Sequence, residues 1–168
     1  MRGSAACSGH WSPESATWPG GESISWSRLE LAGELILDTG ALVSLLDRSQ
    51  DSHEEFVLFF TQWKREVVST EAVLTEATHL LGRVPGGRET CVDFFLNGGA
   101  VLVPPSMASL EKTRTLMAKY ADLPMDYADA TLVVLAEEVG TDLILTTDKR
   151  GFSVYRMNKN RRFRILPD

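Results

Sequence analysis

Short aliphatic runs alternate with longer helical segments from residue 35 to the end of the chain. Four runs are typical of buried strands and a fifth is expected at the sheet edge: 35–37, 67–69, 100–103, 143–146 and 163–166. The segments between them carry apolar residues at helical spacing, as in the stripe of Phe56, Phe59, Phe60 and Trp63. This alternation predicts an α/β fold with a central parallel sheet of four to five strands sandwiched by helices.

The first 33 residues differ from the rest of the chain. They are rich in Ser, Gly, Trp and Pro and show neither a helical nor a strand period. We therefore predict that residues 1–33 are a disordered or non-native leader and that residues 34–168 form the folded domain. The alternative is a short arm that binds a partner through Trp11, Trp18 and Trp26.

Composition narrows the class of protein. A chain of 168 residues fits one domain, and its net charge of -6 argues against a protein that coats nucleic acid by bulk attraction. The cysteines, Cys7 and Cys91, are too few for a disulfide framework or a zinc cage. No apolar run approaches the roughly 20 residues that span a bilayer, and the start of the chain lacks a signal-peptide pattern. We therefore expect a cytoplasmic protein without membrane contact.

Three aspartates are expected to meet at one edge of the sheet. Ligands of an open parallel sheet bind beyond the carboxyl ends of its strands, and Asp38 and Asp148 each follow a predicted strand. Asp129 lies in the first turn of a helix of about 13 residues, which runs roughly 20 Å before the next strand returns a similar distance. The start of that helix and the end of that strand then lie at the same level, so Asp129 is expected beside Asp148.

Glu76 is the fourth acid. It falls inside the apolar stripe of its helix, which is formed by Val73, Ala77, Leu80 and Leu81. A buried glutamate without a basic partner is costly, and a divalent cation shared with other carboxylates would remove that cost. Mg²⁺ and Mn²⁺ prefer oxygen ligands and can promote attack of water on a phosphodiester. The four acids therefore predict a Mg²⁺ or Mn²⁺ site for phosphodiester hydrolysis.

Each acid also has a structural interpretation. Asp38 is suited to open the next helix as an N-cap, and Asp126 and Asp129 suit a cap and a first-turn acid favoured by the helix dipole. His79 follows Glu76 by three residues, as in di-iron bundles, but the sequence has no second pair of this kind. The convergence of four acids on one edge favours the metal site over these separate explanations.

Four segments resemble the acid-bearing motifs of PIN domains: 35–39 (LILDT), 71–77 (EAVLTEA), 125–130 (MDYADA) and 145–152 (LTTDKRGF). They are similar, in order, to the first strand and acid, the second-acid helix, the third-acid segment and the fourth-acid strand end with its trailing aromatic. The resemblance covers about residues 35–168 and implies a PIN-like fold. It also implies RNA hydrolysis with Mg²⁺ or Mn²⁺ held by Asp38, Glu76, Asp129 and Asp148, leaving 5′-phosphate and 3′-hydroxyl ends.

Compact PIN proteins of this size are mostly VapC-type toxins. The resemblance therefore also implies a homodimer and a cognate antitoxin protein that enters the active site. The chain departs from the family in two places: the leader that precedes Leu35, and the extra acid Asp126 near Asp129.

Residues beside the acids have supporting roles in this hypothesis. Thr39 and Thr147 adjoin the first and fourth acids and are suited to hydrogen-bond a carboxylate or a metal water, with backbone capping as the alternative. Asp126 could ligate metal, but helix capping is favoured. Arg150 and Arg156 could contact RNA phosphates, with a solvated charged surface as the alternative.

The leading functional hypothesis is a Mg²⁺- or Mn²⁺-dependent endoribonuclease, the toxin of a toxin–antitoxin pair. An alternative from another class is a catalytically inactive PIN-like module that binds RNA or a protein partner. The intact set of acids counts against it. A receiver-like phosphoacceptor would need an acidic pair beside the first strand, whereas Leu37-Asp38-Thr39 supplies one acid there.

Overall fold

Five short strands form one parallel sheet in the computed structural model, which describes residues 34–123 and 125–168. The predicted leader, residues 1–33, lies outside the described residues. All neighbouring strands pair in parallel. The strands are β1 Leu35–Leu37, β2 Val67–Thr70, β3 Val101–Val103, β4 Leu143–Leu145 and β5 Arg164–Leu166. The α/β fold with a parallel sheet, and the strand predicted at its edge, are confirmed.

The order of the strands creates a switch point at the centre of the sheet. The order is β3-β2-β1-β4-β5, so the chain moves outward from β1 to β3 and then returns to the other side of β1 for β4 and β5. In open parallel sheets, crevices for ligands form where the strand order reverses, at the carboxyl ends of the strands. Here that position is the shared end of β1 and β4.

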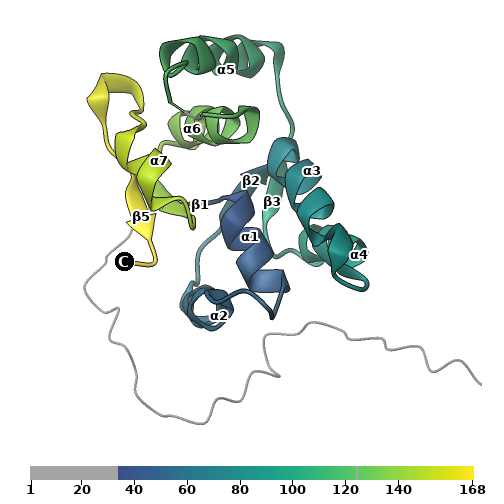
Figure 1. Ribbon diagram of the computed structural model, residues 1–168. Helices are drawn as coiled ribbons and strands as arrows, with labels where there is room; N and C mark the ends of the chain where they lie inside the picture. Colours follow the sequence, from purple (N-terminus) through teal and green to yellow (C-terminus); the bar gives the residue numbers. More distant parts are fainter. Residues whose placement is uncertain (1–33, 124) are drawn as a thin grey trace, which may run out of the picture. The chain divides into compact units, whose positions relative to one another are not determined.

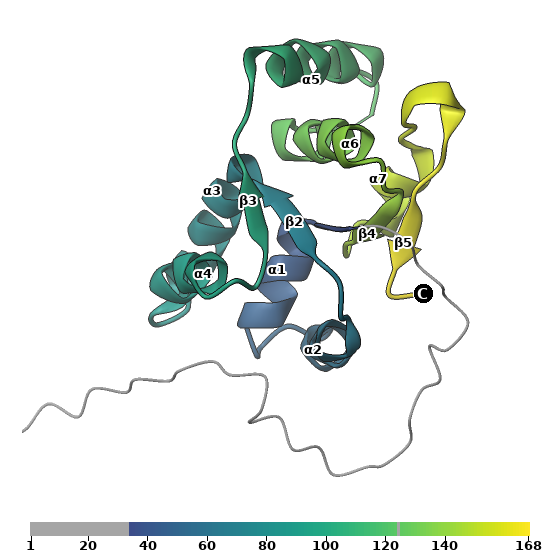
Figure 2. The same ribbon diagram turned by 180° about the vertical axis from the view of Figure 1, so that it is seen from behind.

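Helices link the strands and cover the sheet. They are α1 Thr39–Leu46, α2 His53–Gln62, α3 Glu71–Leu80, α4 Gly87–Leu96, α5 Met107–Lys119, α6 Tyr127–Val139 and α7 Lys149–Val154, with short 3₁₀ turns at Leu81–Arg83 and Asn158–Asn160. Helix α1 packs against α2 and α3, whereas α6 packs on β1 and β2 and carries α5. Figures 1 and 2 show α5 as the outermost helix, on the far side of α6 from the strands. Because crossovers between parallel strands are right-handed, the two helix groups belong to opposite faces of the sheet.

Burial explains why these strands are aliphatic along their whole length. Every residue of β1 and β4 is buried, as expected for parallel strands covered on both faces. The edge strand β3 is more open, and its Val101 is 47% exposed. In the aromatic stripe of α2, Phe56 and Phe59 are buried, so they belong to the core.

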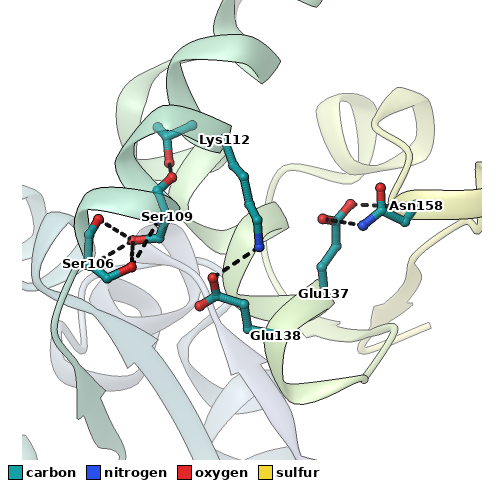
Figure 3. A network of polar contacts seen from close by, with 7 residues as sticks. Ser106, Ser109, Lys112, Glu137, Glu138 and Asn158 are labelled. Carbon is teal, nitrogen blue, oxygen red and sulfur yellow. Dashed lines mark hydrogen bonds and ion pairs between the residues drawn. The ribbon is translucent and has the colours of Figure 1, made fainter.

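Polar contacts tie the outer helix and the C-terminal segment to α6. Lys112 on α5 lies 3.3 Å from Glu138 on α6. The neighbouring Glu137 accepts two hydrogen bonds from Asn158, one from its backbone nitrogen at 2.7 Å and one from its side-chain nitrogen at 2.8 Å (Figure 3). The segment that follows α7 is therefore attached to the same helix that carries Asp129.

None of the helices in residues 34–123 and 125–168 combines the length and the apolar character needed to cross a membrane.

Candidate metal centre

Asp38 is the most buried of the four predicted acids. It directly follows β1, is 6% exposed, and accepts hydrogen bonds of 2.6 Å from the backbone nitrogen of Thr39 and from the hydroxyl of Thr146. Burial raises the pKa of Asp38 to about 6, although the two hydrogen bonds act in the opposite direction. The negative charges of Glu76 and Asp148 raise this pKa further. Asp38 is therefore a carboxylate that lacks compensating charge.

Glu76 lies beside Asp38 through a shared neighbour. The Thr39 hydroxyl donates to Glu76 Oε2 at 2.8 Å, which connects α3 to the start of α1. Glu76 is half-buried, not enclosed in the core as its apolar stripe suggests. This difference arises because the stripe of α3 ends at the border of an open cleft, and Glu76 lines that cleft. The costly buried acid is thus Asp38, whereas Glu76 lies on the wall of the cleft.

Asp129 occupies the first turn of α6. Asp126 caps this helix by accepting a hydrogen bond from the Asp129 backbone nitrogen at 2.9 Å. The hydroxyl of Tyr155 donates to Asp129 Oδ2 at 3.1 Å. Burial raises the pKa of Asp129 to about 7, with further contributions from the negative charges of Asp126 and Asp38. Hydrogen bonds from Tyr155 and the Asp126 backbone act in the opposite direction.

Asp148 closes the group from the end of β4. Its side chain caps α7 by accepting a hydrogen bond from the Gly151 backbone nitrogen at 2.9 Å, and its own nitrogen donates to the Thr146 hydroxyl at 2.8 Å. A β-carbon added at Gly151 would lie only 2.1 Å from Asp148 Oδ2, so a larger residue there would displace the Asp148 carboxylate. Burial and the charge of Asp129 raise the pKa of the Tyr155 phenol above its ordinary value, and Asp148 contributes to the same rise.

The structure therefore brings all four acids into one electrostatically coupled group. Asp38 is affected by Glu76 and Asp148, and Asp129 by Asp38. Among the described residues, none of the groups that shift these two pKa values is a basic side chain. Mutual repulsion without a cationic counterpart is the condition that a bound cation relieves.

The donor set fits a hard divalent cation. Carboxylate oxygens suit Mg²⁺ or Mn²⁺, whereas zinc sites usually draw on His and Cys. Within residues 34–123 and 125–168, no group of three or more His, Cys, Asp and Glu side chains is already arranged to hold a metal ion. The acids instead accept hydrogen bonds from the protein. Binding would therefore need rotation of side chains, with waters completing the coordination, as Mg²⁺ tolerates.

A cleft of about 660 Å³ borders this group at Glu76. Its walls come from α3, from the start of α5 and its preceding loop, and from α6. Glu76 and Asp126 line it together with apolar residues such as Pro105, Leu110 and the exposed Tyr127. A chain that bound in the cleft would pass directly beside Glu76.

Of the residues predicted to support the acids, Thr39 and Asp126 contact or affect one of them, whereas the role expected of Thr147 belongs to Thr146. Thr39 contacts Glu76 through its hydroxyl, and Asp126 caps α6 while its charge acts on Asp129. Thr147 is exposed, and its hydroxyl lies so close to Gly40 that a β-carbon there would be 2.0 Å from it. The hydrogen bond to the first acid comes from the neighbouring Thr146.

The predicted RNA contacts also differ from each other. Arg150 is exposed in the first turn of α7, two residues after Asp148. Arg156 is half-buried, and its guanidinium donates to the backbone oxygens of Ser153 and Tyr155 at 2.7 Å and 2.8 Å. Arg150 is the better placed of the two to meet a phosphate.

Sequence reasoning missed Thr146 and Tyr155. Leu37 pairs with Leu145 in parallel, so the residues that follow them, Asp38 and Thr146, lie side by side. A correct prediction of the strand register would therefore have identified Thr146 as a neighbour of Asp38. Tyr155 reaches Asp129 across 26 residues from beyond the end of α7. No local spacing signals that contact.

Comparisons with known proteins agree with the fold. The family profile of the PIN domain matches residues 35–157. Ribonuclease VapC26 of Mycobacterium tuberculosis is 33% identical over 135 residues, which covers 79% of this chain and 100% of that protein. The crystal structure of M. tuberculosis VapC20, a sarcin-ricin loop cleaving toxin, matches with a TM-score of 0.58 and 15% identity, covering 66% of this chain and 86% of that one. A toxin–antitoxin complex from Klebsiella pneumoniae matches with a TM-score of 0.55 and 17% identity, covering 71% and 91% respectively.

Proposed function

The chain belongs to the PIN-domain family, in its VapC branch, and we propose that it is an endoribonuclease dependent on Mg²⁺ or Mn²⁺. Asp38, Glu76, Asp129 and Asp148 hold the metal in this proposal. The observation that carries the proposal is the electrostatic coupling of these acids at the switch point of the sheet. Among the described residues, no basic side chain contributes to the pKa shifts of Asp38 and Asp129. The similarity to VapC26, a ribonuclease, supports the choice of RNA.

The protein's own contribution to the chemistry is a set of negative oxygens gathered at one edge of the sheet. Thr39, Thr146 and Tyr155 each donate a hydroxyl hydrogen bond to one of the acids and limit its rotation. A bound divalent ion supplies the positive charge that lets a phosphodiester approach these carboxylates, and it promotes the attack of water on phosphorus. Attack of water and departure of the 3′ oxygen leave a 5′-phosphate and a 3′-hydroxyl end.

RNA reaches the acids from two sides in this proposal. Lys149 and Arg150 are exposed at the start of α7 and suit the phosphates beside the cut bond. The cleft beside Glu76 has room for the neighbouring part of the chain. In contrast to Arg150, Arg156 has a structural role in this proposal, because its guanidinium already donates hydrogen bonds to the backbone.

We further propose that the protein is the toxin of a toxin–antitoxin pair, acts in the cytoplasm, and forms a homodimer. The similarity to VapC26 and to a toxin–antitoxin complex supports an antitoxin partner. Apolar side chains on and after the edge strand β3 support the dimer: Val101, Met107 and Leu110 are 47%, 75% and 42% exposed.

An RNA cleavage assay with matched variants tests the proposed activity. Purified protein is incubated with single-stranded and structured RNA in Mn²⁺ or in EDTA, beside Asp38→Asn and Asp129→Asn. Asp93→Asn, the same change at an exposed acid of α4, is the control. We expect cleavage by wild type and Asp93→Asn in Mn²⁺, and none in EDTA or in the other two variants. Binding of RNA without cleavage in Mn²⁺ would favour the inactive module, and cleavage that persists in both variants would contradict the assigned site.

A further inference from the structure

Tyr155 contacts the acid group from the C-terminal end of α7, the helix that Asp148 caps at its other end. Its hydroxyl donates to Asp129 Oδ2 at 3.1 Å, although the two residues are 26 positions apart. Tyr155 ends α7, so the contact joins the C-terminal segment to the first turn of α6. The Asp126 backbone also acts on the Asp129 carboxylate, and Tyr155 supplies the hydrogen bond from a side chain.

The tyrosine is held firmly enough to fix its partner. It is 1% exposed, and its ring packs on Tyr120 at 5.3 Å and edge-on against Phe152 at 5.4 Å. The Tyr120 hydroxyl accepts a hydrogen bond of 3.0 Å from the backbone nitrogen of Arg156, the next residue along the chain. Rings packed on two sides and a bound neighbour leave the phenol little freedom to move.

A second attachment keeps the segment aligned with α6. Asn158 donates twice to Glu137, which lies on α6 about two turns, or roughly 12 Å, after Asp129 (Figure 3). The C-terminal segment is therefore bound to the helix at two separate points. One of these points is the carboxylate of a proposed metal ligand.

We propose that Tyr155 is a positioning residue for the metal centre, whose hydroxyl holds one oxygen of Asp129 so that the other oxygen can bind the ion. The inference rests on the proposed function. It assigns the aromatic cluster of Tyr120, Phe152 and Tyr155 a second task beyond packing, because the cluster orients a ligand as outer-sphere hydrogen bonds do in metalloproteins.

Tyr155→Phe tests this role, because phenylalanine keeps the ring packing and removes only the hydroxyl. Mn²⁺ affinity is measured by titration calorimetry on metal-free protein, without RNA. We expect the variant to bind Mn²⁺ about 10–100-fold more weakly, with a melting temperature only a few degrees lower because one hydrogen bond is lost. In cleavage assays it should need more Mn²⁺ yet approach the wild-type kcat at saturating metal. Thr115→Val, which removes an exposed hydroxyl of α5 that bonds only the Glu111 backbone oxygen, should bind Mn²⁺ as wild type does.

A double variant separates positioning from a general structural effect. In the Asp129→Asn background, Tyr155→Phe should cause no further loss of Mn²⁺ affinity, because the carboxylate that it positions is already altered. An equal loss in both backgrounds, or wild-type affinity in Tyr155→Phe alone, would overturn the inference. Failure of the proposed function has a different signature: wild type would bind no Mn²⁺, or Asp129→Asn would bind it unchanged.

Discussion

Replacing Asp38 with asparagine should stabilise the metal-free protein while it abolishes metal binding. The pKa of Asp38 rises from 3.8 to about 6. Each unit corresponds to about 1.4 kcal/mol, so the charged carboxylate costs the folded state about 3 kcal/mol near pH 8. Asparagine removes that charge and keeps an oxygen for the Thr39 backbone nitrogen. Weakening of the Thr146 hydrogen bond offsets about 1 kcal/mol, which leaves a net gain of about 1–2 kcal/mol.

Thermal unfolding in EDTA measures this gain and its pH dependence. A gain of about 1–2 kcal/mol corresponds to a rise of about 3–6 °C in Tm for a chain of this size. The raised pKa penalises the folded state only where Asp38 is ionised. The gain should therefore be largest near pH 8 and shrink as the pH falls through about 6. Near pH 3, where most of the carboxyl is protonated in both states, the weakened Thr146 hydrogen bond should leave the variant slightly less stable than wild type. Asp93→Asn should leave Tm unchanged at both pH values. A lower Tm for Asp38→Asn at pH 8, or the same difference at both pH values, would refute the reasoning.

Three further outcomes follow from the same geometry. The metal-free wild type should lose stability as the pH rises from about 4 to about 7, because folding raises the pKa of Asp38 to about 6 and that of Asp129 to about 7; melts in Mg²⁺ should show a smaller loss. Gly151→Ala should reduce the rate of RNA cleavage at least about 10-fold, because its β-carbon would displace Asp148. A cleavage assay checks this, provided that the variant melts at the same temperature as wild type. Arg150→Ala should weaken RNA binding and reduce the slope of log affinity against log salt by about one, as measured by fluorescence anisotropy; an unchanged slope would remove Arg150 from the RNA path.

The placement of the acids was predictable from the sequence because it depends on element ends. Asp38 and Asp148 follow strands of a parallel sheet, and Asp129 starts the helix that leads back to β4. Those relations hold for any strand order. The order itself, with β1 and β4 adjacent, was not predicted, since it depends on pairing between segments far apart in the sequence.

Local pattern failed where tertiary contacts decide. Helix α7 has six residues and a glycine inside it, so its sequence shows no helical period, and the capping side chain of Asp148 defines its start. The apolar stripe of α3 suggested a buried Glu76, but α3 borders the cleft and leaves this side chain half-exposed. Both differences concern the same edge of the sheet, where packing against other segments decides burial.

The central claim is that four carboxylates that lie far apart in the sequence bind one divalent ion together. Crystals soaked in Mn²⁺ and measured at a wavelength where manganese scatters anomalously test it directly. We predict an anomalous peak bound by oxygens of Asp38 and Asp129, with Glu76 and Asp148 as further ligands or hydrogen-bonded to its waters. No peak in this group at saturating Mn²⁺, or a peak that persists there in Asp38→Asn, would contradict the account.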